Sequence, residues 1–273
     1  MMKIGNRMFD TEHDCYIMGI LNVTPDSFSD GGQWNDLDRA RQHVADMIAE
    51  GASIIDVGGE STRPGHVQIS IEEEIARVVP YIRMIKENFD IPVSIDSYKS
   101  EVVEAALAAG ADLVNDIWGF KYDRRVADVT AKYNVPCCLM HNRHEPVYEN
   151  YMTDVCNDLR ESVDIALAAG VQPDQIILDP GVGFGKNYEH NLIITNELEK
   201  LIGLGYPVLL ATSRKSMIGL TLDLPSDQRV EGTLVTTVFG VMKGASFIRV
   251  HDVKENYRAI KMTQAILLEH KPE

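Results

Sequence analysis

The stretch PVSIDSYKSEVVEAALAAGADLVNDI (92–117) decides the fold, because it contains a strand, a helix and the next strand in succession. Its two short apolar runs, 92–97 and 112–117, are rich in Val, Ile and Leu, as expected for parallel strands buried on both faces. Between them lies a helical stretch near 99–109, and Gly110 follows it where glycine commonly ends a helix. The stretch therefore predicts one βα unit and the strand that follows it.

The same alternation continues from one end of the chain to the other. Strands are predicted near 16–23, 53–59, 92–97, 112–117, 136–141, 176–181, 207–213 and 246–251. Helices are predicted near 36–50, 71–89, 99–109, 123–134, 153–169, 189–203, 231–244 and 253–269. No linker, low-complexity tract or repeat interrupts this order, so a single domain spanning 1–273 is the economical interpretation.

Polar residues at the strand ends favour a closed barrel over an open doubly wound sheet. An open sheet builds its site at one switch point from a few strands, whereas a barrel brings all eight ends to one mouth. The polar ends are Asn22, Asp56 with Glu60, Asp96, Asn115 with Asp116, His141, Asp179, Ser213 with Lys215, and Arg249 with His251. We therefore predict an α/β fold, a (β/α)8 TIM barrel whose active site lies at the C-terminal mouth of the strands.

Some of these polar residues could serve structure alone. Asp, Asn or Ser after a strand often caps the following helix, and Asp116, Ser97 and Asp56 could do no more than this. Arg249 and His251, two positions apart, would point to the same side of the last strand. A buried cation pair is costly without a partner, which favours an anionic ligand.

Charge and composition limit the partners of the chain. The 26 basic and 41 acidic residues give a formal charge of −15, which disfavours binding to nucleic acid or to an anionic membrane. The N-terminus has no apolar segment typical of a signal peptide, and no apolar run approaches the length of a membrane span. The four cysteines show no metal-binding spacing. We expect reduced cysteines and a cytoplasmic location.

Two long motifs carry a family resemblance. MGILNVTPDSFSDGG (18–32) and IIDVGGESTRPG (54–65) closely resemble the two signatures of dihydropteroate synthases. Further blocks follow in family order: SIDSYKSEV (94–102), LVNDIWG (113–119), LMHNR (139–143), ILDPGVGFGK (177–186), LLATSRKSMIG (209–219) and FIRVHDV (247–253). The resemblance implies that the chain joins 6-hydroxymethyl-7,8-dihydropterin pyrophosphate to p-aminobenzoate, which yields 7,8-dihydropteroate and pyrophosphate for folate biosynthesis.

The resemblance also implies roles for individual residues. It assigns pterin binding to Asp96, Asn115, Asp179 and Lys215, and p-aminobenzoate binding to Thr62, Arg63, Pro64, Phe184 and Ser216. It assigns pyrophosphate binding to Asn22, Arg63, Arg249 and His251, with Asn22 also contacting a Mg²⁺ cofactor. The residues expected to act in catalysis are Asp30, Lys215 and Arg249, of which Asp30 would help to stabilise a pterin cation. Sulfonamide sensitivity and a homodimer are further expectations.

Three other interpretations compete with this one. GVGFGK (181–186) follows a strand but fits neither a GxGxxG nor a Walker A pattern, which argues against a nucleotide site. A methyltetrahydrofolate-type pterin-binding methyltransferase would share Asp96, Asn115 and Asp179 but would not need the pyrophosphate residues. A non-catalytic homologue would have lost residues of the catalytic loops, whereas every matching position is intact here.

Overall fold

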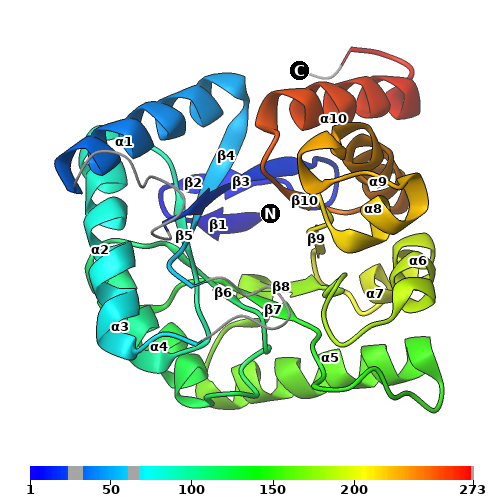
Figure 1. The fold of residues 1–273 in the computed structure, drawn as a ribbon. Helices are drawn as coiled ribbons and strands as arrows, with labels where there is room; N and C mark the ends of the chain where they lie inside the picture. Colours follow the sequence, from blue (N-terminus) through cyan, green and yellow to red (C-terminus); the bar gives the residue numbers. More distant parts are fainter. Residues whose placement is uncertain (24–32, 61–67, 272–273) are drawn as a thin grey trace.

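Eight parallel strands form the barrel in the computed structural model, which describes residues 1–23, 33–60 and 68–271 (Figure 1). These strands are β3 (Tyr16–Asn22), β4 (Ala52–Gly58), β5 (Val93–Asp96), β6 (Leu113–Asp116), β7 (Cys137–Met140), β8 (Ile176–Asp179), β9 (Leu209–Leu210) and β10 (Phe247–Val250). They follow the order β8-β7-β6-β5-β4-β3-β10-β9. A parallel bridge between Leu178 and Val208 joins the two ends of this order, which closes the barrel. The predicted fold class is confirmed.

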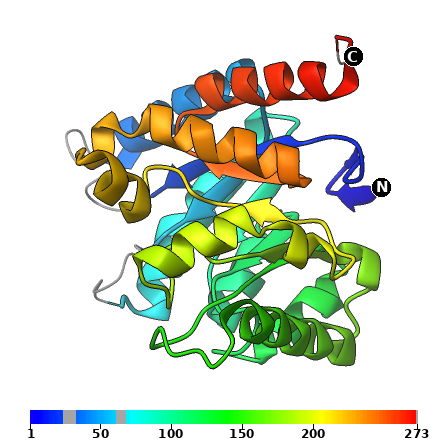
Figure 2. The ribbon, with the colours of Figure 1, turned by 90° about the vertical axis from the view of Figure 1, so that its right-hand side faces the viewer.

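Helices surround the barrel on all sides (Figures 1 and 2). They are α1 (Gln33–Glu50), α2 (Ile71–Asn88), α3 (Ser100–Ala108), α4 (Arg125–Tyr133), α5 (Tyr151–Ala169), α6 (Tyr188–Asn196), α7 (Glu199–Ile202), α8 (Ser216–Leu222), α9 (Val230–Lys243) and α10 (Val253–Leu268). Gly110 follows α3 with a φ of +109°, a conformation that glycine adopts at little cost. The predicted role of this glycine as a helix stop is confirmed.

The prediction of one continuous helix over 189–203 is wrong, because two helices, α6 and α7, occupy this segment. Thr195 Oγ1 donates to the carbonyl of Asn191, and Asn191 Nδ2 donates to the carbonyl of Asn187. Side chains that bond back to a carbonyl four residues earlier often bend a helix. Leu198, which lies between the two helices, is fully buried. The break therefore turns an apolar residue towards the core.

The short helix α8 was not predicted from the sequence. Gly219 lies within it, and glycine lowers the intrinsic preference of a short segment for helix. A Cβ at this position would lie 2.2 Å from a guanidinium nitrogen of Arg229. Arg229 in turn donates to the carbonyls of Leu224 and Arg214. Gly219 therefore lets Arg229 pack against α8 and fasten it to the loop after β9.

An N-terminal hairpin covers one end of the barrel, at the right in Figure 2. Its strands are β1 (Met2–Ile4) and β2 (Arg7–Phe9), which pair antiparallel. Asn6 donates to Asp90, which precedes β5, so the hairpin lies at the N-terminal ends of the barrel strands. The opposite, C-terminal ends of the strands therefore form the mouth, which faces the viewer in Figure 1.

Two hydrophobic cores lie on the two sides of the barrel wall. The inner core joins the hairpin to side chains that point into the barrel, and Cys138 belongs to it. The outer core fills the space between strands and helices, and Cys137 belongs to that one. Adjacent residues of a strand point to opposite faces, which explains this division. All four cysteines are free, as predicted.

Candidate active site at the barrel mouth

Strand register places four residues in one row across the mouth. Asn22 of β3 pairs with Gly58 of β4, Gly58 pairs with Asp96 of β5, and Asp96 pairs with Asn115 of β6. Gly58 contributes no side chain to this row. A Cβ at Gly58 would lie 3.6 Å from Asp96 and 3.7 Å from Asn22 Oδ1, so a larger residue would fill the space between them.

Arg249 connects this row to the far side of the barrel. Its Nη2 atom donates to Asp96 Oδ2 at 2.6 Å, and its Nε atom donates to Asp56 Oδ2 at 2.6 Å. Asn115 Nδ2 donates to the same oxygen of Asp56 at 3.3 Å. Asp56 is completely buried, so it holds both Arg249 and Asn115 from beneath. From the sequence, Asp56 was placed among the polar strand ends or interpreted as a possible cap, and its hold on Arg249 and Asn115 was missed.

The charges in this cluster do not balance. Two carboxylates share one guanidinium, and Asp56 Oδ1 and Asp96 Oδ1 are buried without a hydrogen-bond donor among the described residues. Burial raises the pKa of Asp96 to about 7, Arg249 opposes the shift, and the charge of Asp56 adds to it. Burial also acts to lower the pKa of Arg249, but the two carboxylates outweigh it and the pKa is raised. The cluster can therefore accept a proton or an N–H donor.

The ion pairs of Arg249 correct one inference from the sequence. Burial of Arg249 together with His251 was expected to favour an anionic ligand, but Asp56 and Asp96 already compensate the charge of Arg249. His251 has a different partner from Arg249: its Nδ1 atom lies 2.9 Å from Ser213 Oγ, in the loop after β9. Burial of Arg249 therefore does not by itself require an anion, and an anionic ligand at Arg249 and His251 stays a prediction.

Asp179 and Lys215 form the other half of the mouth. Asp179 Oδ1 accepts a 2.7 Å hydrogen bond from the backbone N–H of Gly181. Lys215 Nζ donates to the carbonyl of Val182 and lies 4.8 Å from the centre of the Phe184 ring. Burial lowers the pKa of Lys215 to about 8, and the negative charge of Asp179 opposes this shift. Burial likewise raises the pKa of Asp179, against the effect of Lys215.

The structure brings most of the predicted site residues to one end of the barrel. Arg249 and Asp96 both influence the pKa of Lys215, which places the two halves of the mouth within electrostatic reach of each other. Ser216 begins α8 directly after Lys215, and Phe184 lies in the loop after β8. Four further predictions, Asp30, Thr62, Arg63 and Pro64, lie outside the described residues.

Asp116 serves the backbone rather than the site, although it does not cap the following helix α4 as the structural alternative predicted. Its two carboxylate oxygens accept hydrogen bonds from the backbone N–H groups of Trp118 and Phe120, at 2.7 and 3.1 Å. It therefore shapes the turn after β6, and the neighbouring Asn115 is the residue of this strand that joins the cluster at the mouth.

A metal site made by protein ligands alone is absent from the described part of the chain. No group of three or more His, Cys, Asp or Glu residues lies close enough there to hold an ion. Asn22 offers an exposed amide at the mouth, two strands away from Asp96. A single amide oxygen suits Mg²⁺, which keeps several waters and commonly shares substrate phosphate oxygens.

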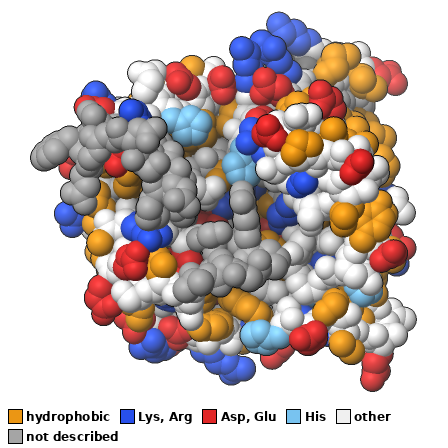
Figure 3. All heavy atoms as spheres, in the orientation of Figure 1, with side chains coloured by type: hydrophobic (Ala, Val, Ile, Leu, Met, Phe, Trp, Pro, Cys, Tyr) orange, Lys and Arg blue, Asp and Glu red, His pale blue; other side chains and the backbone are white. Residues whose placement is uncertain are grey.

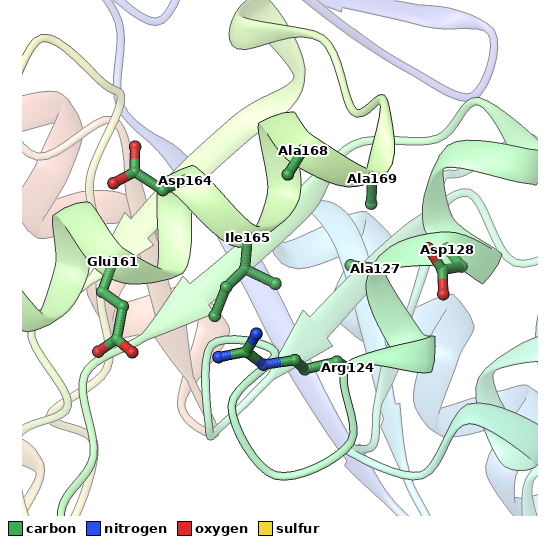
Figure 4. Close-up of a pocket in the computed structure, with 8 residues that line it drawn as sticks. All are labelled: Arg124, Ala127, Asp128, Glu161, Asp164, Ile165, Ala168 and Ala169. Carbon is green, nitrogen blue, oxygen red and sulfur yellow. The ribbon is translucent and has the colours of Figure 1, made fainter.

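A surface hollow between α4 and α5 is unrelated to the mouth. It has a volume of about 400 Å³, and its lining includes Arg124, Asp128, Glu161 and Asp164 (Figure 4). The hollow contains none of the predicted site residues.

Among the helices that the structure describes, none has the length and apolar character needed to cross a membrane.

Comparison with known proteins gives a consistent family. Residues 18–251 match the model of the family described as pterin binding enzyme. A dihydropteroate synthase of Clostridium beijerinckii is 63% identical over 267 residues, which are 97% of this chain and 99% of that one. A crystal structure of dihydropteroate synthase from Clostridium difficile in the presence of pteroic acid is 50% identical, with a TM-score of 0.93, covering 95% of this chain and 99% of that one. A Yersinia pestis dihydropteroate synthase in complex with a sulfonamide drug is 41% identical, with a TM-score of 0.91, covering 97% and 98%.

Proposed function

The chain belongs to the dihydropteroate synthase family of pterin-binding enzymes, and we propose that the residues at its barrel mouth carry out the reaction of that family. The enzyme condenses 6-hydroxymethyl-7,8-dihydropterin pyrophosphate with p-aminobenzoate to form 7,8-dihydropteroate and pyrophosphate in folate biosynthesis. The observation that carries the residue roles is the cluster of Asp96, Asn115 and Arg249, which lies within electrostatic reach of Lys215 and Asp179. No observation favours the methyltransferase or the non-catalytic homologue.

The pterin is bound by the carboxylates of the mouth. Its aminopyrimidinone edge presents N–H donors beside a carbonyl acceptor, and a carboxylate can accept two such donors in parallel. Asp179 accepts from the 2-amino and N3 edge, while Asp96 and Asn115 contact the other side of the ring. The buried oxygen Asp96 Oδ1 then gains the donor that the described protein residues do not provide. Lys215 meets the carbonyl oxygen and a ring nitrogen.

The pyrophosphate leaves past Arg249 and His251. Arg249 uses its Nε and one Nη2 hydrogen bond for Asp56 and Asp96, and a guanidinium has five N–H donors, so donors remain for phosphate oxygens. Asn22 would hold Mg²⁺ through its amide oxygen. Bound there with pyrophosphate oxygens and water, Mg²⁺ would supply positive charge for the leaving group. Donors placed where negative charge grows lower the barrier more than uniform binding does.

The p-aminobenzoate amine attacks the exocyclic methylene of the pterin. The C–O bond to pyrophosphate breaks and leaves a pterin cation, the C–N bond to the amine then forms, and the amine nitrogen releases one proton to solvent. The amine is already neutral at pH 7, so the mechanism needs no strong general base. Phe184 and Ser216 form the described part of the p-aminobenzoate pocket. The family resemblance adds Thr62, Arg63 and Pro64 to this pocket, and adds Asp30 as the residue that stabilises the pterin cation.

A homodimer and a cytoplasmic location complete the proposal. Large hydrophobic side chains are exposed on neighbouring helices α9 and α10, and hydrophobic atoms gather over this side of the molecule at the right in Figure 3. These side chains are Val235, Phe239, Met242, Met262 and Ile266. Extended exposed apolar surface commonly marks a protein interface, and a second copy of the chain is the partner proposed. The four free cysteines agree with a reducing compartment.

Competition by a sulfonamide tests the function. Initial rates would be measured over a matrix of p-aminobenzoate and sulfamethoxazole concentrations at saturating pterin pyrophosphate, with the product identified by mass. The proposal predicts competitive inhibition towards p-aminobenzoate and the mass of dihydropteroate. Inhibition that p-aminobenzoate cannot relieve would contradict the shared pocket. Chelation by EDTA is expected to abolish turnover, and added Mg²⁺ is expected to restore it.

A further inference from the structure

A second buried polar cluster lies beneath the loop 181–186, outside the residues used in the proposed mechanism. At its centre, Lys186 Nζ donates to the carbonyls of Gly181 and Phe184, both at 2.9 Å. The same nitrogen lies 2.8 Å from His141 Nδ1. Lys186 therefore ties the first and fourth residues of its own loop to a residue at the end of β7.

His141 passes this connection on to Asp158 of α5. Because the carboxylate of Asp158 can only accept, the ring proton of His141 lies on Nε2, and His141 Nδ1 then accepts from Lys186. His141 Nε2 then donates to Asp158 Oδ2 at 3.0 Å. Arg143 Nε donates to the same oxygen at 2.6 Å. The side chain of His141 is completely buried, so this order of donors and acceptors is fixed by the fold.

Close backbone contact holds the loop against the same segment. Gly181 has a φ of +67°, and a Cβ there would lie 1.9 Å from the carbonyl oxygen of His141. Gly185 has a φ of +53°, and a Cβ there would lie 2.5 Å from the carbonyl oxygen of Arg143. Tyr148 also donates to the carbonyl of Gly185 at 2.6 Å. One face of the loop is therefore fixed against the segment that follows β7.

The other face of the loop carries two groups of the site. The carbonyl of Val182 accepts from Lys215 Nζ, and the ring of Phe184 lies 4.8 Å from the same nitrogen. We propose that Lys186, held by His141 and Asp158, is a positioning residue that sets the Phe184 ring and the Val182 carbonyl for binding p-aminobenzoate. This inference rests on the proposed function of the site.

Lys186→Met tests the inference, because methionine keeps the unbranched stem and removes the hydrogen bonds of Lys186 Nζ to His141, Gly181 and Phe184. We expect the KM for p-aminobenzoate to rise roughly tenfold, as the loss of buried charged hydrogen bonds implies. The Kd of dihydropterin pyrophosphate, measured by calorimetry without p-aminobenzoate, is expected to change less than the KM for p-aminobenzoate. Lys215 and Asp179 contact the loop, but Asp96 and Asn115 are held from other strands by Arg249 and Asp56. Lys200→Met is the matched control, because Lys200 is an exposed lysine paired with Glu197 on the outer surface, and both constants should stay unchanged.

Asp158→Asn provides a second variant if Lys186→Met does not fold. It keeps the shape of the side chain, removes the charge that holds His141 and Arg143, and is expected to raise the same KM roughly threefold. A fall in kcat and in melting temperature, with the KM for p-aminobenzoate and the Kd of dihydropterin pyrophosphate unchanged, would show a merely structural role and overturn the inference. Unchanged values of KM in both variants would overturn it as well. A wild-type enzyme without p-aminobenzoate-dependent pyrophosphate release would instead contradict the proposed function.

Discussion

Arg249 Nη2 on β10 donates a 2.6 Å hydrogen bond to Asp96 Oδ2 on β5, although 153 residues separate the two in the sequence. The guanidinium also binds Asp56, so one cation serves two buried carboxylates. A site with this surplus of negative charge accepts N–H donors readily, which is the property that a pterin-binding pocket requires. The remaining N–H groups of Arg249 stay available for a phosphate group.

Removing the shared cation should destabilise the fold. Arg249→Met leaves Asp56 and Asp96 buried without their partner, and breaking such a pair costs about 3 kcal/mol of unfolding free energy. Denaturant unfolding at pH 7 measures this loss. The loss should shrink at pH 5. The charge of Arg249 lowers the pKa of Asp96, so this pKa is raised further in Arg249→Met than in the wild type, and protonation at low pH then stabilises the folded variant more than the folded wild type. Adding Asp56→Asn to Arg249→Met should recover part of the stability, and a further loss would contradict the charge imbalance.

Pterin binding should release a proton from Asp96. The pKa of Asp96 is raised to about 7 by burial, so at pH 6 the free enzyme holds this carboxyl mainly protonated. N–H donors of the pterin favour the carboxylate and expel the proton. Calorimetry at pH 6 in buffers of different ionisation enthalpy should give a release approaching about one proton, falling to none near pH 8.5. Asp96→Asn should abolish the release, and an undiminished release in this variant would assign it to another group.

The pH–rate profile should report the ammonium of Lys215. Burial lowers its pKa to about 8, so the free enzyme loses this positive charge as pH rises through that value. Since kcat/KM for the pterin substrate follows the free enzyme, it should fall above about pH 8. Lys200→Met should leave the profile unchanged because Lys200 is exposed and lies outside the mouth. A profile that stays flat to about pH 10 would contradict a role for the charged form of Lys215.

Two glycine substitutions separate steric clash from backbone strain. Gly181 and Gly205 both have positive φ values, of +67° and +88°. An alanine methyl at position 181 would lie 1.9 Å from the carbonyl oxygen of His141, whereas one at position 205 would meet open space. Gly205→Ala should cost about 1 kcal/mol from backbone strain alone. Gly181→Ala adds overpacking against His141 and should cost about 3 kcal/mol or more. Equal losses of unfolding free energy in the two variants, measured by thermal unfolding, would show that the loop can move away from His141.

Much of the barrel could be predicted because its strands are short apolar runs in a regular order. The N-terminal hairpin was missed, since β1 and β2 have three residues each and too few positions to show a period. The helix α8 was missed because it is short and contains Gly219. Tertiary packing, which local sequence does not encode, decides both elements.

The site residues could be named from motifs, but their contacts could not. Asp56 and Arg249 lie 193 residues apart, and their ion pair depends on barrel closure and on strand register. The argument that buried Arg249 needs an anion to compensate its charge failed because this partner could not be foreseen. Lys186 was set aside with the loop 181–186 as a phosphate-loop decoy. Its contact with His141 follows only from the adjacency of β7 and β8 in the sheet.

Pyrophosphate release tests the central claim most directly. It would be followed with Mg²⁺ and dihydropterin pyrophosphate, with and without p-aminobenzoate, in the wild type, Lys215→Ala, Arg249→Ala and the control Lys200→Met. We predict release that requires p-aminobenzoate in the wild type and in Lys200→Met, with a loss of at least about a hundredfold in the two mouth variants. Tight pterin binding without release in the wild type, or full activity in both mouth variants, would contradict the assignment of this site.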